Sequence, residues 1–203
     1  MNENTIFRIL VATIILISLS VSIYFRRKAQ SSSRDEIDRR QEGSITMVGL
    51  RIGGLMIWLT VIAFIIYPPA ISWAALSLPS WVRWLGVAGS ITAALLLVWM
   101  FISLGMNITD SVTTRHEHKL VTRGPYRWIR HPLYTFGALL FLSLSLIMGT
   151  WLIPLLGIPS YGILIHRTGI EEKMLQDRFG EQYRKYSERT GRFFPRLGRV
   201  ISL

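Results

Sequence analysis

The feature that most constrains this chain is an uncharged run of 33 residues, from Leu133 to Ile165. Three other apolar stretches precede it, at Ile9–Phe25, Ile52–Tyr67 and Trp84–Met106. Half of the 203 residues are hydrophobic and only 17% are charged. Runs of this length are typical of membrane-spanning helices, because backbone polar groups inside a bilayer must be hydrogen-bonded within the segment. The sequence therefore predicts an all-α integral membrane protein.

The topology follows from the length of the last run and from the position of the basic residues. At about 1.5 Å per residue, 33 residues reach roughly 50 Å, which is too long for one bilayer core of about 30 Å and short for two. Basic residues are dense before the second run, before the fourth run and after it, whereas the segment around Pro68 has none before Arg83. The positive-inside rule therefore predicts a hairpin that turns near Gly149-Thr150.

This pattern gives about five transmembrane helices, of which the last two form a hairpin, and a cytoplasmic helical tail at residues 166–203. The first run ends at Arg26-Arg27-Lys28 without a small-residue cleavage motif, so we expect a retained helix rather than a signal peptide, with its N-terminus outside. Residues 1–101 are expected to form an N-terminal membrane region with a cytoplasmic linker. Residues 102–203 are expected to form the functional core.

The net charge of +11 would suit a nucleic-acid-binding protein, but its alternation along the chain is explained by topology. We therefore expect membrane lipids and no nucleic acid as partners. The chain has no cysteine, which excludes disulfides, thiolate metal sites and a cysteine nucleophile. No metal site is expected. Small residues such as Gly86 and Gly89 in the third run are expected to permit close helix packing.

A cluster of aromatic and charged residues, GPYRWIRHPLY at positions 124–134, borders the fourth run. A residue before proline is pushed out of the helical region, so His131 should lie at a helix boundary and Pro132 at the first helical position. Such a helix start offers backbone N–H groups and the positive end of the helix dipole to an anionic ligand. Upstream, a glycine-proline pair predicts a turn, after which Tyr126 and Arg130 could share one helical face.

A second polar cluster follows the fourth run. If the last membrane helix continues, Arg167 and Glu171 are four residues apart and share a face. In the predicted hairpin, this end of the helix lies beside the start at Pro132. Two polar clusters would then converge under a hydrophobic bundle, which suits a polar cofactor and a lipophilic substrate.

The order and spacing of these residues resemble the isoprenylcysteine carboxyl methyltransferase family, including its prokaryotic members. The resemblance covers roughly residues 102–197 and rests on His118-Lys119-Leu120-Val121, Gly124, Tyr126, Arg130-His131-Pro132-Leu133-Tyr134, Arg167, Glu171-Glu172, the segment Phe179–Tyr186 and the segment Thr190–Pro195. One position departs from the pattern: relatives often have glycine two residues after the final tyrosine of the RHPxY element, where this chain has Phe136.

The resemblance implies a membrane methyltransferase that uses S-adenosylmethionine without a Rossmann domain, and no GxGxxG unit occurs between a strand and a helix here. The residues that it implies as cofactor contacts are His118, Lys119, Leu120, Val121, Tyr126, Arg130, His131, Pro132, Leu133, Tyr134, Glu171 and Glu172. Arg167 is implied as the clamp of a substrate carboxylate. The expected reaction is O-methylation of a lipophilic, isoprenylcysteine-like carboxylate that arrives from the membrane, at a site that faces the cytoplasm from the cell (inner) membrane.

Other functions stay open at this point. The main alternative is an N-methyltransferase for a phospholipid or small amine, in which Glu172 or His131 would act as the base. An NADPH-dependent membrane reductase is disfavoured by the Glu171-Glu172 pair and the short chain. The non-enzyme alternative is a membrane scaffold or transport-associated protein.

Overall fold

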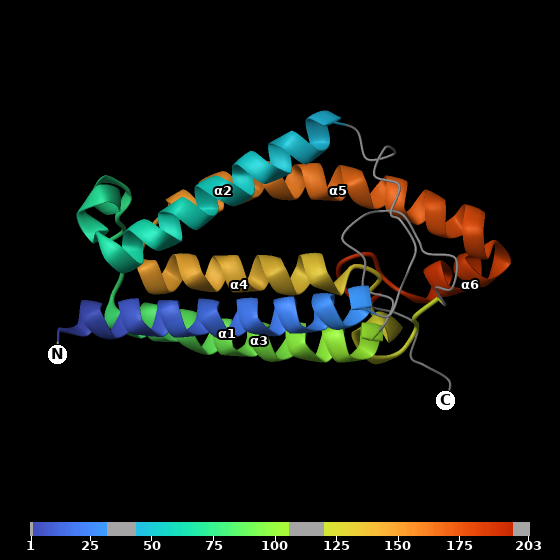
Figure 1. Cartoon of the computed structure of the whole chain (residues 1–203), viewed down its shortest axis with the longest axis horizontal. Helices are drawn as coiled ribbons and strands as arrows, with labels where there is room; N and C mark the ends of the chain where they lie inside the picture. The colour runs from blue at the N-terminus through green and yellow to red at the C-terminus, as the bar shows by residue number, and fades with distance from the viewer. Residues whose placement is uncertain (1, 32–43, 106–119, 197–203) are drawn as a thin grey trace.

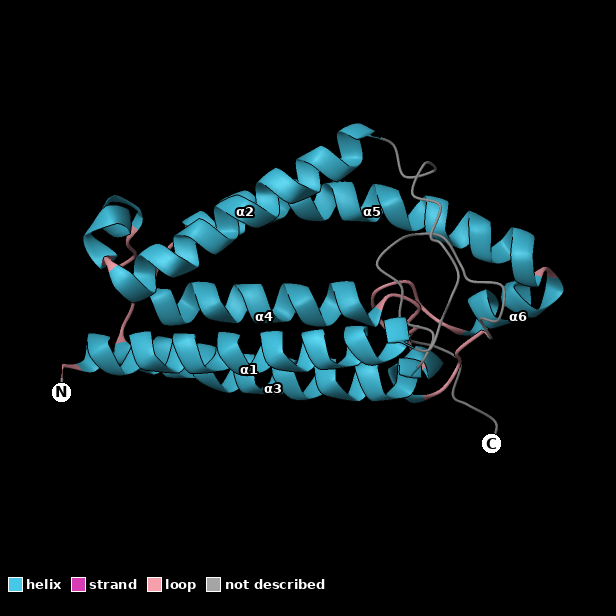
Figure 2. Ribbon diagram, in the orientation of Figure 1, coloured by secondary structure: helices cyan, strands magenta, loops and turns pink. Residues whose placement is uncertain are grey.

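The computed structural model describes residues 2–31, 44–105 and 120–196, and every regular element in these ranges is helical (Figures 1 and 2). The elements are α1 (Glu3–Ser31), α2 (Ser44–Ile66), the 3-10 helix η2 (Pro68–Ala74), α3 (Ser80–Leu104), the 3-10 helix η4 (Gly124–Arg127), α4 (Pro132–Met148), α5 (Leu152–Phe179) and α6 (Glu181–Arg189). The predicted all-α fold is confirmed.

The five long helices run along the long axis of the molecule in alternating directions (Figure 1). The helices α1, α3 and α4 lie side by side, whereas α2 packs mainly against α5. The N-terminus, η2 and the turn between α4 and α5 lie at one end of the bundle. The start of α4, the end of α5 and all of α6 lie at the other end (Figure 1).

Three helices, α1, α2 and α3, are long and apolar enough to cross a bilayer by length and composition. The helix α4 is apolar but has only 17 residues, and α5 has 28 residues, of which the second half is polar. The predicted hairpin is present. Gly149 ends α4 in the left-handed conformation, at φ 61°, and α5 begins three residues later at Leu152.

Two arginines bind the carboxyl ends of neighbouring helices at the turn end of the bundle. The guanidinium of Arg8 on α1 donates to the carbonyl oxygens of Ile65 and Ile66 at the end of α2, with an Nε–O distance of 2.9 Å to Ile65. Arg83 on α3 donates to Ile147 at the end of α4, at 2.8 Å. A cation at the negative end of a helix satisfies carbonyls that have no partner within the helix.

The helices α3 and α4 pack closely because glycines line their contact, as expected from the sequence. A Cβ atom added at Gly86 would lie 2.7 Å from the carbonyl oxygen of Ser143 and 2.9 Å from the backbone nitrogen of Ile147. Gly89 lies against the side chain of the same serine. This close contact fixes the position of α4 against α3, and α4 begins at the predicted polar cluster.

We expect Gly86→Ala to destabilise the bundle by about 1–3 kcal/mol, because the new methyl group meets backbone atoms that cannot move aside by a rotamer change. The matched control is Gly54→Ala on α2, where an added Cβ would meet no atom of the described residues within 4 Å. The control should be neutral or stabilising by up to about 1 kcal/mol, since alanine is a better helix former. Thermal unfolding in detergent measures both. Equal losses in the two variants would contradict the assigned contact.

Candidate active site

The start of α4 is shaped by the residues before it. Gly124 adopts φ +60°, a conformation that favours glycine, and opens the short 3-10 helix η4. That helix ends at Arg127, so Tyr126 and Arg130 do not share a helical face, and this prediction was wrong. His131 has the non-helical angles φ −121° and ψ 62° expected before a proline, and Pro132 is the first residue of α4. The N-terminus of α4 has no side-chain cap.

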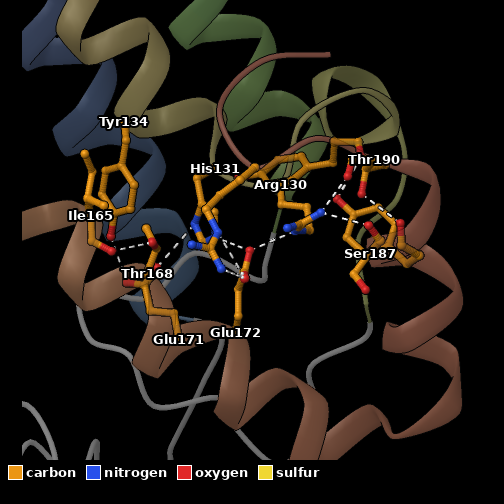
Figure 3. A network of polar contacts seen from close by, with 12 residues as sticks. Arg130, His131, Tyr134, Ile165, Thr168, Glu171, Glu172, Ser187 and Thr190 are labelled. Carbon is orange, nitrogen blue, oxygen red and sulfur yellow. Dashed lines mark hydrogen bonds and ion pairs between the residues drawn. The ribbon is translucent and has the colours of Figure 1, made fainter. Parts of the chain in front are cut away.

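The helix α5 continues past its apolar half and presents Glu171 to this helix start (Figure 3). The phenol of Tyr134 on α4 donates to Glu171 Oε1 at 2.7 Å, and Arg167 Nε lies 3.3 Å from the same oxygen. The second oxygen of Glu171 lies 3.4 Å from His131 Nδ1. The predicted convergence of the two polar clusters is therefore present.

Glu172 lies at the centre of a second set of contacts (Figure 3). Its Oε1 accepts a hydrogen bond from Arg130 Nε at 2.8 Å and lies 3.3 Å from His131 Nε2. Its Oε2 accepts from Arg192 Nε at 3.1 Å, and the Nη2 of that arginine contacts the same oxygen. Both oxygens of this carboxylate therefore have cationic or hydrogen-bonding partners in the protein.

His131 is held between the two glutamates, with one ring nitrogen facing each carboxylate. Burial by itself lowers the pKa of His131, but the hydrogen bonds and negative charges of Glu171 and Glu172 outweigh burial and raise this pKa above its ordinary value of 6.5. The imidazole is therefore favoured in its protonated, cationic form. Its ring stacks on Tyr134, with 5.6 Å between the ring centroids.

The pKa of Glu172 moves in the opposite direction. Burial alone would raise it, but hydrogen bonds from His131, Arg192 and Arg130 hold the pKa well below its ordinary value of 4.5. The ionised carboxylate is thus the stable form at neutral pH, and it is a weak proton acceptor.

The segment after α6 also reaches the site, and sequence reasoning assigned it no role. The backbone of Gly191 pairs with Ile129 in a parallel bridge, and Arg130 Nη1 donates to the carbonyl oxygens of Ser187 and Thr190. The available signal was the position of Thr190–Pro195 within the resembling tail. The spacing could not reveal that this segment folds back onto the start of α4.

Apart from Tyr126, the remaining residues that were predicted to contact the cofactor fall into three groups: those outside the described residues, those just after that gap, and Leu133. His118 and Lys119 lie outside the described residues, and Leu120 and Val121 are half-buried just after that gap. Leu133 is 39% exposed and contributes no polar group to the cluster.

Tyr126 packs against the hydrophobic core cluster that contains Phe136. Burial, the neighbouring Tyr186 and the charge of Glu171 all raise the pKa of the Tyr126 phenol. Phe136, which replaces the usual glycine, is buried against Met100 and other residues of the core between α3 and α4. It therefore fills the core rather than the polar cluster.

A pocket of about 610 Å³ lies at the turn end of the bundle, where it is lined by Arg8, Arg83 and Thr150 among others. Because α4 begins at the polar cluster and ends at this pocket, the two features lie at opposite ends of one helix. The pocket is therefore separate from the candidate active site.

The two shifted groups predict how stability depends on pH. The stabilisation from His131 is complete below pH 6.5 and is lost as the pH rises through its higher folded-state pKa. The stabilisation from Glu172 is complete above pH 4.5 and is lost as the pH falls through its lower folded-state pKa. We therefore expect the largest contribution from this cluster between pH 4.5 and 6.5.

The free energy of unfolding in detergent, measured against pH, tests this expectation. In His131→Gln, the free energy of unfolding should fall less steeply as the pH rises above 6.5. In His166→Gln, at an exposed position on α5, the fall should be the same as in the wild type. If the free energy of unfolding of His131→Gln fell with rising pH as in the wild type, the histidine would not be charged in the folded protein.

Comparisons with known proteins give the family. The model of the phospholipid methyltransferase family matches residues 81–182, which are half of the chain. The protein-S-isoprenylcysteine O-methyltransferase of Tribolium castaneum is 30% identical over 118 residues, which are 57% of this chain and 42% of that protein. This chain thus spans less than half the length of that relative.

The fold also has a counterpart among solved structures. The eukaryotic intramembrane Ras methyltransferase ICMT (isoprenylcysteine carboxyl methyltransferase) superposes with a TM-score of 0.55 at 21% identity, over 92% of this chain and 67% of that chain. At 21% sequence identity, this similarity shows a shared fold alone. The chain belongs to the phospholipid methyltransferase family, and its relatives in sequence and in fold include isoprenylcysteine carboxyl methyltransferases.

Proposed function

We propose that this protein is a membrane methyltransferase that transfers the methyl group of S-adenosylmethionine to the carboxylate of a lipophilic acceptor. The observation that carries the proposal is the convergence of His131 and Tyr134, at the start of α4, with Arg167 and Glu171 on α5. This cluster combines groups that suit a zwitterionic cofactor with an arginine that suits a carboxylate, at one end of an apolar helix bundle.

The residues at the start of α4 fit the cofactor chemically. The cationic His131 and the uncapped N-terminus of α4 suit its carboxylate end. Glu171 and Tyr134 suit its ammonium or hydroxyl groups, because one accepts and the other donates hydrogen bonds. The resemblance adds His118–Val121 and Tyr126 to this set. When bound, the sulfonium supplies a methyl group that is open to in-line displacement.

Arg167 is the proposed clamp of the acceptor carboxylate. Its guanidinium carries five N–H donors in a planar fork, of which Nε faces Glu171 at 3.3 Å. An ionised carboxylate is already a nucleophile, so the protein needs only to orient it and exclude water. The new bond forms between a carboxylate oxygen and the methyl carbon, and the electron pair of the broken carbon–sulfur bond stays on sulfur.

The alternative is N-methylation of a phospholipid or small amine, and the matching family is described as phospholipid methyltransferase. A protonated amine must lose a proton before or during transfer, and the sequence offers Glu172 or His131 as the base. The surroundings of both groups argue against this role. The carboxylate of Glu172 has a lowered pKa, and His131 is favoured in its protonated form. The favoured protonation states of these two groups therefore support a carboxylate acceptor over an amine.

The acceptor is proposed to enter sideways from the lipid phase, while the cofactor arrives from the aqueous side. The basic residues before the second and fourth runs and after the last one support a site that faces the cytoplasm from the cell (inner) membrane. Reporter fusions at residue 43 and at the C-terminus should then report cytoplasm, and fusions near Pro69 and Thr150 the outside. A cytoplasmic signal at Thr150 would reverse the proposed orientation.

The function is tested by transfer of labelled methyl from S-adenosylmethionine into membrane extracts, followed by chemical identification of the product. A base-labile methyl ester supports the carboxylate, and a stable N-methyl product supports the alternative. Absence of any labelled product together with no binding of S-adenosylhomocysteine, the demethylated cofactor, would reject both.

The role of Arg167 is tested by Arg167→Lys, which keeps the positive charge but loses the planar fork. We expect methyl transfer to fall by about tenfold or more, which corresponds to about 1.4 kcal/mol of transition-state stabilisation. The affinity for S-adenosylhomocysteine should stay near that of the wild type. Arg178→Lys is the matched control, because this residue lies on the same helix and contacts the ring of Phe179. Full activity of Arg167→Lys would favour the amine-methylating alternative.

A further inference from the structure

The segment that follows α6 packs against the candidate active site and is hydrogen-bonded to the residues that precede α4. The backbone nitrogen of Arg130 donates to the carbonyl oxygen of Gly191 at 2.8 Å, and that of His131 donates to Arg192 at 3.0 Å. In return, Gly191 donates to the carbonyl oxygen of Trp128 at 3.0 Å. The segment from Trp128 to His131, which sets the position of the imidazole, is therefore hydrogen-bonded to residues that lie 61 to 63 positions later in the chain.

Side chains reinforce this pairing on both sides of His131. Thr135 Oγ1 on α4 donates to the carbonyl oxygen of Phe193 at 2.9 Å. The ring of Phe193 lies 5.8 Å from the imidazole and 6.0 Å from the ring of Tyr161 on α5. The tail therefore contacts α4, α5 and the imidazole at the same time.

Arg192 makes the contact with the most specific consequence. Its Nε lies 3.1 Å from Glu172 Oε2, while the other oxygen of the same carboxylate faces Arg130 and His131. The two arginines therefore bind opposite oxygens, which prevents the carboxylate from rotating away from the imidazole. The side chain of Glu172 is only 14% exposed, whereas that of Arg192 is 43% exposed.

We propose that Arg192 is a positioning residue of the cofactor site, which acts by fixing Glu172 and, through it, the orientation of the imidazole of His131. The proposal rests on the function proposed above. Arg192 lies on the far side of Glu172 from the imidazole, so its effect passes through this carboxylate. Residues 190–193 are thereby part of the active-site architecture rather than a solvent-exposed tail.

A positioning role predicts a loss of cofactor affinity that a second cation at position 192 reverses. The groups that face Glu172 are Arg130, His131 and Arg192 by direct contact, and Tyr183 and Tyr186 of α6 with the neighbouring Glu171 at longer range. Removing Arg192 removes one of the three partners that favour the ionised carboxylate, while burial continues to oppose ionisation. Arg130 and His131 still lower the pKa of Glu172, so the carboxylate stays ionised between pH 4.5 and 8. Without Arg192, however, it can rotate away from the imidazole, and the loss of affinity should be similar across this pH range.

The experiment measures the affinity for S-adenosylhomocysteine by calorimetry between pH 4.5 and 8, on the purified full chain in detergent. Arg192→Gln should weaken binding about three- to tenfold at neutral pH, the range between exposed ion pairs and hydrogen bonds to charged groups. Arg192→Lys, which restores a cation beside Glu172, should return the affinity towards the wild-type value.

Arg184→Gln is the matched control. It removes an arginine of the same tail that is 55% exposed and pairs with Glu181 and Glu188 rather than with the site. We expect wild-type affinity and an unchanged pH profile. The melting temperature of each variant is measured in parallel, and that of Arg192→Gln should match that of Arg184→Gln.

The possible outcomes separate this inference from the function itself. Wild-type protein that binds no S-adenosylhomocysteine at any pH would reject the proposed function. Wild-type protein that binds, with Arg192→Gln indistinguishable from Arg184→Gln in affinity and pH profile, would overturn only the positioning role. A loss of affinity that Arg192→Lys does not reduce, or a melting temperature far below that of the control, would likewise overturn it, because the effect would then not come from a cation that orients Glu172.

Discussion

The candidate active site depends on one interaction, the clamp of a single imidazole between two adjacent carboxylates. His131 ends the loop that precedes α4, and Glu171 and Glu172 lie on α5, so this clamp joins the two arms of the hairpin at the end where they are not covalently connected. Neighbouring residues on a helix point about 100° apart, and this angle lets the two carboxylates face different nitrogens of one ring. The two carboxylates raise the pKa of the imidazole and so favour its cationic form, in which both ring nitrogens can donate to α5.

The clamp also restricts the chemistry that the site can perform. The two groups that could act as bases, Glu172 and His131, stabilise each other in their charged forms, which lowers the pKa of Glu172 and raises that of His131. A nucleophile that is already ionised suits such a site. The arginines that surround the cluster serve different purposes: Arg130 and Arg192 engage the carboxylate of Glu172, whereas Arg167 is the proposed contact of the acceptor.

Much of this arrangement follows from local rules that can be applied along the chain. The uncharged runs identify the helices, the alternation of basic residues predicts their directions, and a histidine before a proline predicts the boundary at which α4 begins. The i, i+4 spacing correctly pairs Arg167 with Glu171 once α5 is known to continue. The one local prediction that was wrong, a helical face shared by Tyr126 and Arg130, extrapolated helical geometry through a 3-10 turn that ends at Arg127.

By itself, the sequence determined the helical class, the hairpin and the two polar clusters, because these depend on composition and on spacings within one element. Only the tertiary structure decided which charges meet. The pairing of Glu172 with Arg130 and Arg192, and the backbone pairing of Gly191 with Ile129, join segments that lie between 20 and 62 residues apart. Such contacts are selected by the packing of whole helices: the glycine-lined contact of α3 with α4 and the return of the chain after α6. No periodicity within either partner encodes them.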